Sequence, residues 1–391
     1  MRTTVGIIGA GPAGLLLARL LHVAGIDSVV LESRDRAYVE HRQRAGILEQ
    51  GTVDVLRAVG AGGRMDREGL RHDGIELRFA RRRHRVDFPG LADGRSVMVY
   101  AQTEVCKDLI ALQLKEGGPL LFEAEALAVE DADTARPRVP FRHDGREDVL
   151  ECDYVVGCDG FWGVARTAFP AALSRTFERT YPYGWLGILA DVAPSHDELV
   201  YARHDRGFAL LSMRSPRVSR LYLQVPADTD AGDWSDDAVW AELERRFETA
   251  DGWRLERGPI TQKSVTPMRS YVHEPMRYGR VFLAGDAAHI VPPTGAKGLN
   301  LAVGDVVTFA RALTHRKETG SAGLLDAYSA TCLRRVWQAE RFSYDMTTLL
   351  HPAPDATDFE HRLQLARLER IAANRAARTD LAEGYTGFPL D

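Results

Sequence analysis

Three glycines near the N-terminus have the spacing of a dinucleotide-binding turn. Gly9, Gly11 and Gly14 follow an apolar segment (4–8) typical of a buried strand and lie at the start of a Leu- and Ala-rich segment (12–24) typical of a helix. In this pattern the first glycine permits a tight turn, the second lets the backbone approach a pyrophosphate, and the third allows close helix–strand packing. Free N–H groups at the helix start favour phosphates. We therefore predict a dinucleotide site rather than a turn with only a packing role.

Three acidic residues stand where further strands are expected to end. Glu32 closes the segment 28–32, where a carboxylate can accept hydrogen bonds from a ribose hydroxyl. Asp159 follows one apolar run, and Asp286 follows another among small residues that would let the backbone approach a ligand. By itself, each of the last two positions fits an ordinary turn equally well.

Ser212 and Arg214 are candidates for binding an anion. They lie in and just after an alternating run, 207–212, and residues two apart on a strand point to one face. A guanidinium matches a carboxylate in a bidentate manner, which a lysine cannot do. The spacing alone is a modest signal, because any pair two residues apart meets it and an exposed face would satisfy it as well.

The elements that must position these residues change character along the chain. The strand–helix–strand start predicts a parallel pair, whereas 181–266 alternates like an antiparallel sheet and the chain after about 320 is helical. A strand and a helix return between the last two regions, so the first domain must be discontinuous. We predict an α/β fold with a Rossmann-like dinucleotide-binding domain, an antiparallel-sheet domain and a C-terminal helical region. The expected boundaries are 1–72, 97–180 and 267–320 for the first domain, 73–96 and 181–266 for the second, and 321–391 for the helical region.

Composition excludes several classes of protein. The 391 residues are 45% hydrophobic and 27% charged, as in an ordinary globular protein, and the formal net charge of -5 argues against a binder of nucleic acid. No apolar stretch reaches about 18 residues, so we expect no membrane span. The four cysteines form no CxxC pair, which argues against a disulfide framework or a zinc site and fits a reducing cytoplasm. We expect no metal.

The sequence resembles the group A flavoprotein aromatic hydroxylases, whose three FAD fingerprints are GxGxxG, a central DG motif and a C-terminal GD motif. Here the second and third are Asp159-Gly160 and Gly285-Asp286. Longer strings resemble family members that act on 4-hydroxybenzoate, and the similarity continues to Tyr385. They are RQRAGILEQ at 42–50, YPYGWLG at 181–187 and PPTGAKGLN at 292–300.

The resemblance implies an FAD-dependent monooxygenase that converts 4-hydroxybenzoate to 3,4-dihydroxybenzoate with NADPH or NADH and O2, through a flavin C4a-hydroperoxide. The electrophilic oxygen needs an electron-rich ring, so the enzyme must help to remove the phenolic proton. By resemblance, the catalytic residues are Tyr201, Tyr385, His72 and Pro293, with His72 handing the proton to solvent and the Pro293 carbonyl accepting from the substrate hydroxyl. The substrate-binding residues are Ser212, Arg214 and Tyr222, together with Tyr201 and Pro293.

The resemblance also assigns two sets of cofactor contacts. Arg34 and Arg36 could favour the 2′-phosphate of NADPH, but Asp35 and Glu40 counter them, so NADPH is only slightly favoured and NADH or dual use stays open. Trp162 stands where a family member has histidine. The FAD set is Gly9, Gly11, Gly14, Glu32, Arg42, Arg44, Gln102, Asp159, Arg220, Asp286, Lys297, Leu299 and Asn300, and the nicotinamide set is Arg34, Tyr38, Arg44, Trp162 and Arg269.

Two alternatives remain at this point. Arg214 would define only a carboxylate, so the substrate could be a related acid such as a 3-hydroxybenzoate or an aminobenzoate. A non-catalytic FAD-fold binding protein, like the GDP-dissociation inhibitors, is the other class, and the complete set of Asp159, Asp286 and 293–300 argues against it. The resemblance further implies a homodimer through the helical region.

Overall fold

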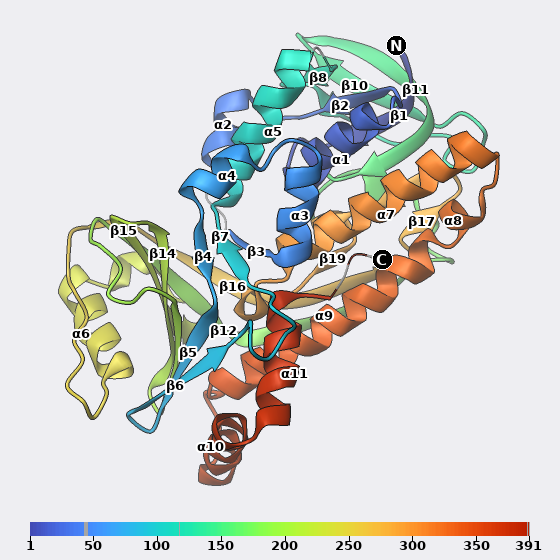
Figure 1. The fold of residues 1–391 in the computed structure, drawn as a ribbon. Coiled ribbons are helices and arrows are strands. Elements are labelled where there is room, and N and C mark those ends of the chain that lie inside the picture. The colour runs from blue at the N-terminus through green and yellow to red at the C-terminus, as the bar shows by residue number, and fades with distance from the viewer. Residues whose placement is uncertain (43–45, 117, 389, 391) are drawn as a thin grey trace.

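The computed structural model describes residues 1–42, 46–116, 118–388 and 390. Within these residues the strands form three sheets, and Figure 1 shows the first sheet beside the N-terminus and the second near α6. The predicted fold class is confirmed: a Rossmann-like α/β layer is joined to a largely antiparallel sheet and a C-terminal group of helices.

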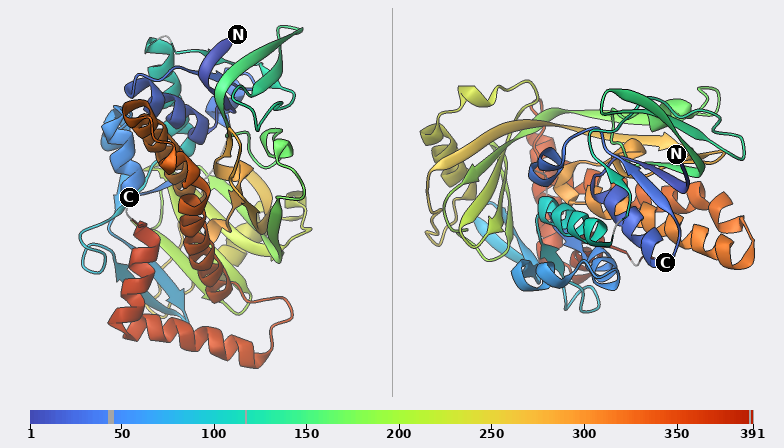
Figure 2. Two further views of the ribbon diagram at one scale, coloured as in Figure 1. Left: turned by 90° about the vertical axis from the view of Figure 1, so that its right-hand side faces the viewer. Right: turned by 90° about the horizontal axis from the view of Figure 1, so that it is seen from above.

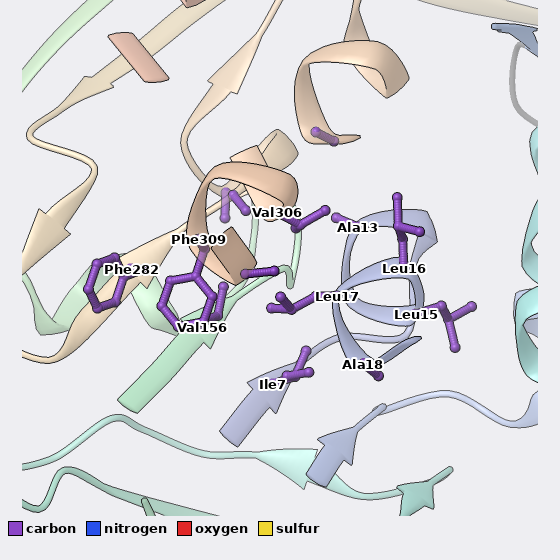
Figure 3. Packing of buried hydrophobic residues seen from close by; sticks show 14 of the residues in the cluster. Ile7, Ala13, Leu15, Leu16, Leu17, Ala18, Val156, Phe282, Val306 and Phe309 are labelled. Atoms are coloured by element: carbon purple, nitrogen blue, oxygen red, sulfur yellow. The ribbon is translucent and has the colours of Figure 1, made fainter. Parts of the chain in front are cut away.

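The first sheet carries the glycine-rich turn. Its central strands are parallel, and α1 (Pro12–Val23), which connects β1 to β2, and α7 (Gly298–Thr319) pack on it. Figure 3 shows Leu17, Val306 and Phe309 of these helices packed near Ile7 and Val156 of the strands. The strands are, in spatial order, β17 (Arg277–Tyr278), β18 (Val281–Leu283), β11 (Arg146–Gly157), β1 (Arg2–Ile8), β2 (Ser28–Leu31) and β8 (Leu120–Leu121), with β10 (Arg138–His143) beside β11 and β9 (Glu125–Ala126) beside β10.

The second sheet separates two cores. One face packs on α6 (Asp236–Phe247), and the other holds Tyr201 in a cluster with residues of α9 and α11. Its pairs are antiparallel except for β13 with β5, which are parallel. The strands are, in order, β19 (His289–Ile290), β16 (Ile260–Glu274), β12 (Arg175–Ala190), β15 (Val218–Pro226), β14 (Gly207–Ser215), β13 (Leu199–His204), β5 (Gly74–Phe79) and β6 (Arg82–Asp87).

A small sheet and four helices connect the two layers. The small sheet has the order β3 (Ile47–Glu49), β7 (Val97–Val99) and β4 (Leu70–His72). The helices are α2 (Arg36–His41), α3 (Gln50–Ala58), α4 (Gly63–Glu68) and α5 (Gln102–Glu116).

The C-terminal helices return Tyr385 to the core of the second sheet, and Leu390 beyond them packs against the core of the first. The long helix α9 (Tyr328–Leu350) follows the short α8 (Gly323–Asp326), and α10 (Asp358–Ala373) and α11 (Arg375–Thr386) then fold back (Figure 2, left). Each of β12 and β16 runs unbroken across a position where we divide the domains, and the division given above stays a proposal. Among the described residues, no helix combines the length and the apolar character needed to cross a membrane.

Candidate active site

The turn between β1 and α1 uses its glycines in different ways. Gly9 has a φ of +100°, which disfavours other residues, and a Cβ on Gly14 would overlap the carbonyl oxygen of Gly9. At Gly11, by contrast, no described atom lies within 4 Å of the position of an added Cβ. Gly9 and Gly14 are therefore needed by the fold, while Gly11 keeps open the space where a pyrophosphate would pass.

Alanine substitutions should separate these two roles. Gly14→Ala is expected to lower the free energy of unfolding by about 2–3 kcal/mol, since backbone atoms must move apart. Gly11→Ala should leave the apoprotein's melting temperature unchanged but weaken FAD binding by about tenfold or more. Thermal unfolding of the apoprotein and FAD titration measure the two effects. Wild-type FAD affinity in Gly11→Ala would show that the nucleotide does not pass over this turn.

Glu32 ties the turn to the end of β2. Its carboxylate accepts hydrogen bonds from the backbone N–H groups of Ala10 (2.7 Å) and Arg34 (2.8 Å), and its side chain is buried. A hollow of about 380 Å³ lies beside Ser33 and Arg34, bounded on its far side by the β10–β11 hairpin. Its position next to Glu32 suits the adenosine half of a dinucleotide.

The two aspartates of the other motifs follow neighbouring strands. Gly157 of β11 pairs with Leu283 of β18, so Asp159 and Asp286 follow the same edge of the sheet as Gly9. Asp159 accepts the Ala165 N–H (2.8 Å) through Oδ2, whereas its buried Oδ1 has no hydrogen-bond partner among the described residues. Burial raises the pKa of Asp159. Asp286 is exposed.

These features test whether the chain can hold FAD. Three features lie at one edge of the first sheet. They are the buried Asp159 oxygen with no hydrogen-bond donor among the described residues, the exposed Asp286 and the open turn at Gly11. Sheets of α/β proteins bind nucleotides at this edge. The residues present therefore fit the cofactor.

A buried pair that the sequence analysis did not single out supports the GD motif. Asp305 Oδ2 accepts the Gly285 N–H (2.9 Å) and lies 2.7 Å from His289 Nε2, with both side chains 1% exposed. Burial disfavours the charged imidazole, but the Asp305 carboxylate outweighs it and raises the pKa of His289. The sequence feature that could have revealed this pair is Asp305, a lone aspartate within the apolar stretch that forms α7. The pair holds Gly285 in its left-handed conformation, with φ +62°.

Tyr201 and Tyr385 meet in the interior although 184 residues separate them. Their hydroxyl oxygens are 2.5 Å apart, and the Tyr201 hydroxyl also donates to the Thr294 carbonyl (3.4 Å). Both side chains are 1% exposed, and burial raises the pKa of each phenol above its ordinary value. The pair therefore stays protonated at neutral pH and can pass a proton from one oxygen to the other.

Arg214, Arg220 and Tyr222 gather on neighbouring strands beside this pair. Ser212 pairs with Arg220 across β14 and β15, and Arg220 Nε donates to the Tyr222 hydroxyl. Burial and the charge of Arg220 lower the pKa of Arg214 to about 10. The negative charge of a bound carboxylate would offset both the burial of the Arg214 charge and its repulsion by Arg220. A β-bulge between Met213 and Ser215 makes Arg214 the extra residue, so strict alternation does not govern its direction.

His72 lies in an enclosed position. Its side chain is 1% exposed, and neither ring nitrogen has a hydrogen-bond partner among the described residues. Burial lowers its pKa to about 4, so the imidazole is neutral at pH 7. The expected direct contact with solvent is therefore not seen, and any proton leaving through His72 needs a further acceptor.

Pro293 and Lys297 lie in the loop before α7, and Leu299 and Asn300 lie in the first turn of that helix. The Pro293 carbonyl accepts the Ala296 N–H (3.0 Å), which closes a short 3₁₀ turn. Leu299 is half-buried in the first turn of α7.

Lys297 and Asn300 connect this loop to the segment that begins at Ile47. Lys297 Nζ lies 2.5 Å from Glu49 Oε1, and burial lowers the pKa of the lysine. Asn300 Oδ1 accepts the Glu49 N–H (3.0 Å) and the Thr52 hydroxyl (2.8 Å). Glu49, which we did not assign, thus joins two predicted FAD contacts.

The predicted nicotinamide contacts form two groups. Trp162 is 84% exposed and packs edge-on to Phe161, and the Arg269 guanidinium lies 4.4 Å from the centre of the Phe161 ring. In the other group Arg34 and Arg42 lie over the Tyr38 ring. Arg44 falls outside the described residues, and Gln102 begins α5.

Comparison with known proteins decides the family. The family model described as "FAD binding domain" matches residues 2–343. The p-hydroxybenzoate hydroxylase of Acinetobacter baylyi is 48% identical over 391 residues, which are the whole of this chain and 96% of the relative. The chain belongs to the group A flavoprotein aromatic hydroxylases. The expected FAD-dependent monooxygenase is confirmed, and the non-catalytic alternative is set aside.

Two further comparisons concern less similar proteins. Rifampicin monooxygenase of Streptomyces venezuelae is 28% identical over 355 residues, covering 83% of this chain and 67% of the relative. The crystal structure of p-nitrophenol 4-monooxygenase from Pseudomonas putida superposes with a TM-score of 0.81 over 99% of both chains at 19% identity. That likeness shows the fold alone.

Proposed function

We propose that this chain hydroxylates 4-hydroxybenzoate to 3,4-dihydroxybenzoate. The balanced reaction consumes the acid, NADPH or NADH, a proton and O2, and it releases the dihydroxy acid, the oxidised nicotinamide cofactor and water. The observation that carries the proposal is the buried pair of Tyr201 and Tyr385, with Arg214 on β14, the strand next to the one that carries Tyr201. The activity in the name of the Acinetobacter relative supports it.

The residues divide the work between the two ends of the acid. The Arg214 guanidinium binds the carboxylate, with Ser212 and Tyr222 as further donors. At the other end the single phenolic hydrogen is donated either to the free lone pair of the Pro293 carbonyl, which orients the hydroxyl, or to Tyr201, which takes the proton and passes one on to Tyr385. When bound, FAD supplies the redox chemistry, because it takes a hydride from the nicotinamide cofactor and activates O2.

The product of turnover tests the proposal. Holoenzyme with NADPH or with NADH should oxidise the cofactor much faster when 4-hydroxybenzoate is present, and chromatography should show 3,4-dihydroxybenzoate in proportion. 3-Hydroxybenzoate and 4-aminobenzoate serve as parallel substrates. A dihydroxy product from 3-hydroxybenzoate but none from 4-hydroxybenzoate would reassign the substrate to a related acid.

Arg269 should contribute to nicotinamide binding. We propose that Trp162 offers an exposed aromatic surface to the cofactor while Arg269 neutralises a phosphate. Arg269→Ala is then expected to raise the KM for NADPH by about tenfold without changing the dissociation constant of 4-hydroxybenzoate. Arg257→Ala, which removes an exposed arginine paired with Glu244, is the control. An unchanged KM in Arg269→Ala would remove this group from the nicotinamide site.

We also propose a homodimer through the helical region and a cytoplasmic setting. Phe359 and Leu363 lie one turn apart on α10 and are 71% and 49% exposed, which suits contact with a second copy. The four cysteines, all among the described residues, are free thiols. Light scattering of the purified holoenzyme gives the mass, and a monomer at micromolar concentration would refute the dimer.

A further inference from the structure

His351, the residue after the end of α9, has both ring nitrogens in hydrogen bonds. Nε2 accepts the indole N–H of Trp185 (2.7 Å), and Nδ1 lies 2.9 Å from the Thr347 carbonyl oxygen. An indole nitrogen can only donate and a carbonyl oxygen can only accept, so the proton must sit on Nδ1. Burial lowers the pKa of His351 to about 3, and the ring is a neutral acceptor at working pH.

Trp185 packs against Tyr222 of the neighbouring strand. It lies on β12, whose Gly187 pairs with Tyr222, and its side chain is 4% exposed. The centres of the Trp185 and Tyr222 rings are 4.7 Å apart, and the Phe208 ring lies 5.4 Å away on the same cluster. The indole therefore backs the tyrosine that we assign to the substrate carboxylate.

The same part of α9 also contacts Thr294, next to the tyrosine pair. The hydroxyl oxygens of Thr347 and Thr294 are 2.9 Å apart, and the Thr294 carbonyl accepts from Tyr201. Thr347 and His351 are four residues apart and lie on one side of the chain, which contacts the indole directly and the tyrosine pair through Thr294.

We propose that His351 is a positioning residue for the substrate pocket. By accepting the Trp185 indole N–H it holds the ring against Tyr222 and thereby determines which aromatic acids fit. The proposal rests on the proposed function, since it assigns the pocket to an aromatic acid.

The physical consequence of losing His351 follows from the indole N–H. A buried donor without an acceptor is costly, so the ring would turn toward water in the unliganded pocket. A bound acid must then displace the indole and its water. The penalty therefore appears in the dissociation constant, and we expect about a tenfold loss of affinity.

A double-mutant cycle on the holoenzyme tests the inference. The variants are His351→Phe, Trp185→Phe, both together, and His351→Gln, whose amide offers both an acceptor and a donor. His361→Phe is the matched control, because His361 contacts Arg203 of the same sheet and is not hydrogen-bonded to Trp185. Calorimetry gives the dissociation constants of 4-hydroxybenzoate and 3-hydroxybenzoate, and solvent exchange of the Trp185 indole resonance reports the hydrogen bond directly.

In wild type the Trp185 resonance should be protected from exchange, and His351→Phe should remove the protection and weaken acid binding about tenfold. His351→Gln should restore part of the exchange protection and part of the affinity for the acid. The double variant should bind the acid no more weakly than Trp185→Phe alone. The inference would be overturned if His351→Phe bound the acid with wild-type affinity. It would also be overturned if His351→Phe lost as much affinity in the Trp185→Phe variant as in the wild-type protein. If wild type binds 3-hydroxybenzoate and not 4-hydroxybenzoate, the proposed substrate fails while the cycle still tests His351 with the acid that binds.

Discussion

Replacing Tyr201 with phenylalanine is expected to lower the rate of hydroxylation by at least about 100-fold, the typical contribution of a positioned acid–base group. The change removes the oxygen that lies 2.5 Å from Tyr385, so the phenolic proton of the substrate has no neighbour to receive it. Affinity for the acid should change little, because its carboxylate end is untouched. The rate of 3,4-dihydroxybenzoate formation and the dissociation constant of 4-hydroxybenzoate measure the two quantities separately.

Tyr181→Phe is the control for this substitution. Tyr181 is a buried tyrosine of the same cluster, and its hydroxyl contacts Ser270 rather than the tyrosine pair. The Tyr181→Phe enzyme should hydroxylate 4-hydroxybenzoate at close to the wild-type rate. A Tyr201→Phe enzyme that forms product as fast as Tyr181→Phe would disprove the proton relay.

Replacing Arg214 with glutamine should weaken binding of 4-hydroxybenzoate by about 100-fold, because a buried carboxylate loses its charge partner. Arg214→Lys keeps the charge but not the planar fork, and we expect a loss of about tenfold. Burial and Arg220 already lower the pKa of Arg214 to about 10, so this guanidinium gains from an incoming anion. Calorimetric titration of the holoenzyme gives both constants.

Arg246→Lys is the comparison for Arg214. Arg246 is a buried residue of α6, the helix that packs on the other core of the second sheet, where it pairs with Glu242. Its replacement should reduce stability without changing affinity for the acid. Unchanged affinity in both Arg214 variants would place the carboxylate elsewhere.

Local patterns were sufficient to predict the nucleotide half of the molecule. The positive φ of Gly9 and the approach of Gly14 to the Gly9 carbonyl are set within six residues of the chain, so these glycines indicate the local geometry directly. The edge where Asp159 and Asp286 stand follows from apolar runs that end at those positions, since parallel strands bring their carboxyl ends together.

The strand that carries Arg214 shows where alternation along one strand fails to predict the direction of a side chain. Alternation along β14 predicted one face for Ser212 and Arg214, yet the bulge after Met213 breaks the period at the residue that matters most. A bulge depends on how a strand pairs with its neighbour, which the periodicity of one strand does not contain. Resemblance to the family, rather than spacing, is what assigned Arg214 to the substrate.

The sequence by itself determined the layer architecture and the dinucleotide turn. It also determined the types of residue that bind the acid and transfer its proton. Only the tertiary structure decided that His72 is enclosed, that Asp305 holds Gly285, and that His351 accepts from Trp185. These contacts join residues that are up to 166 positions apart, and their chemistry depends on burial, which sets both the pKa of each group and the cost of leaving it unpaired. Burial is a property of the packed chain, and no window of neighbouring residues contains it.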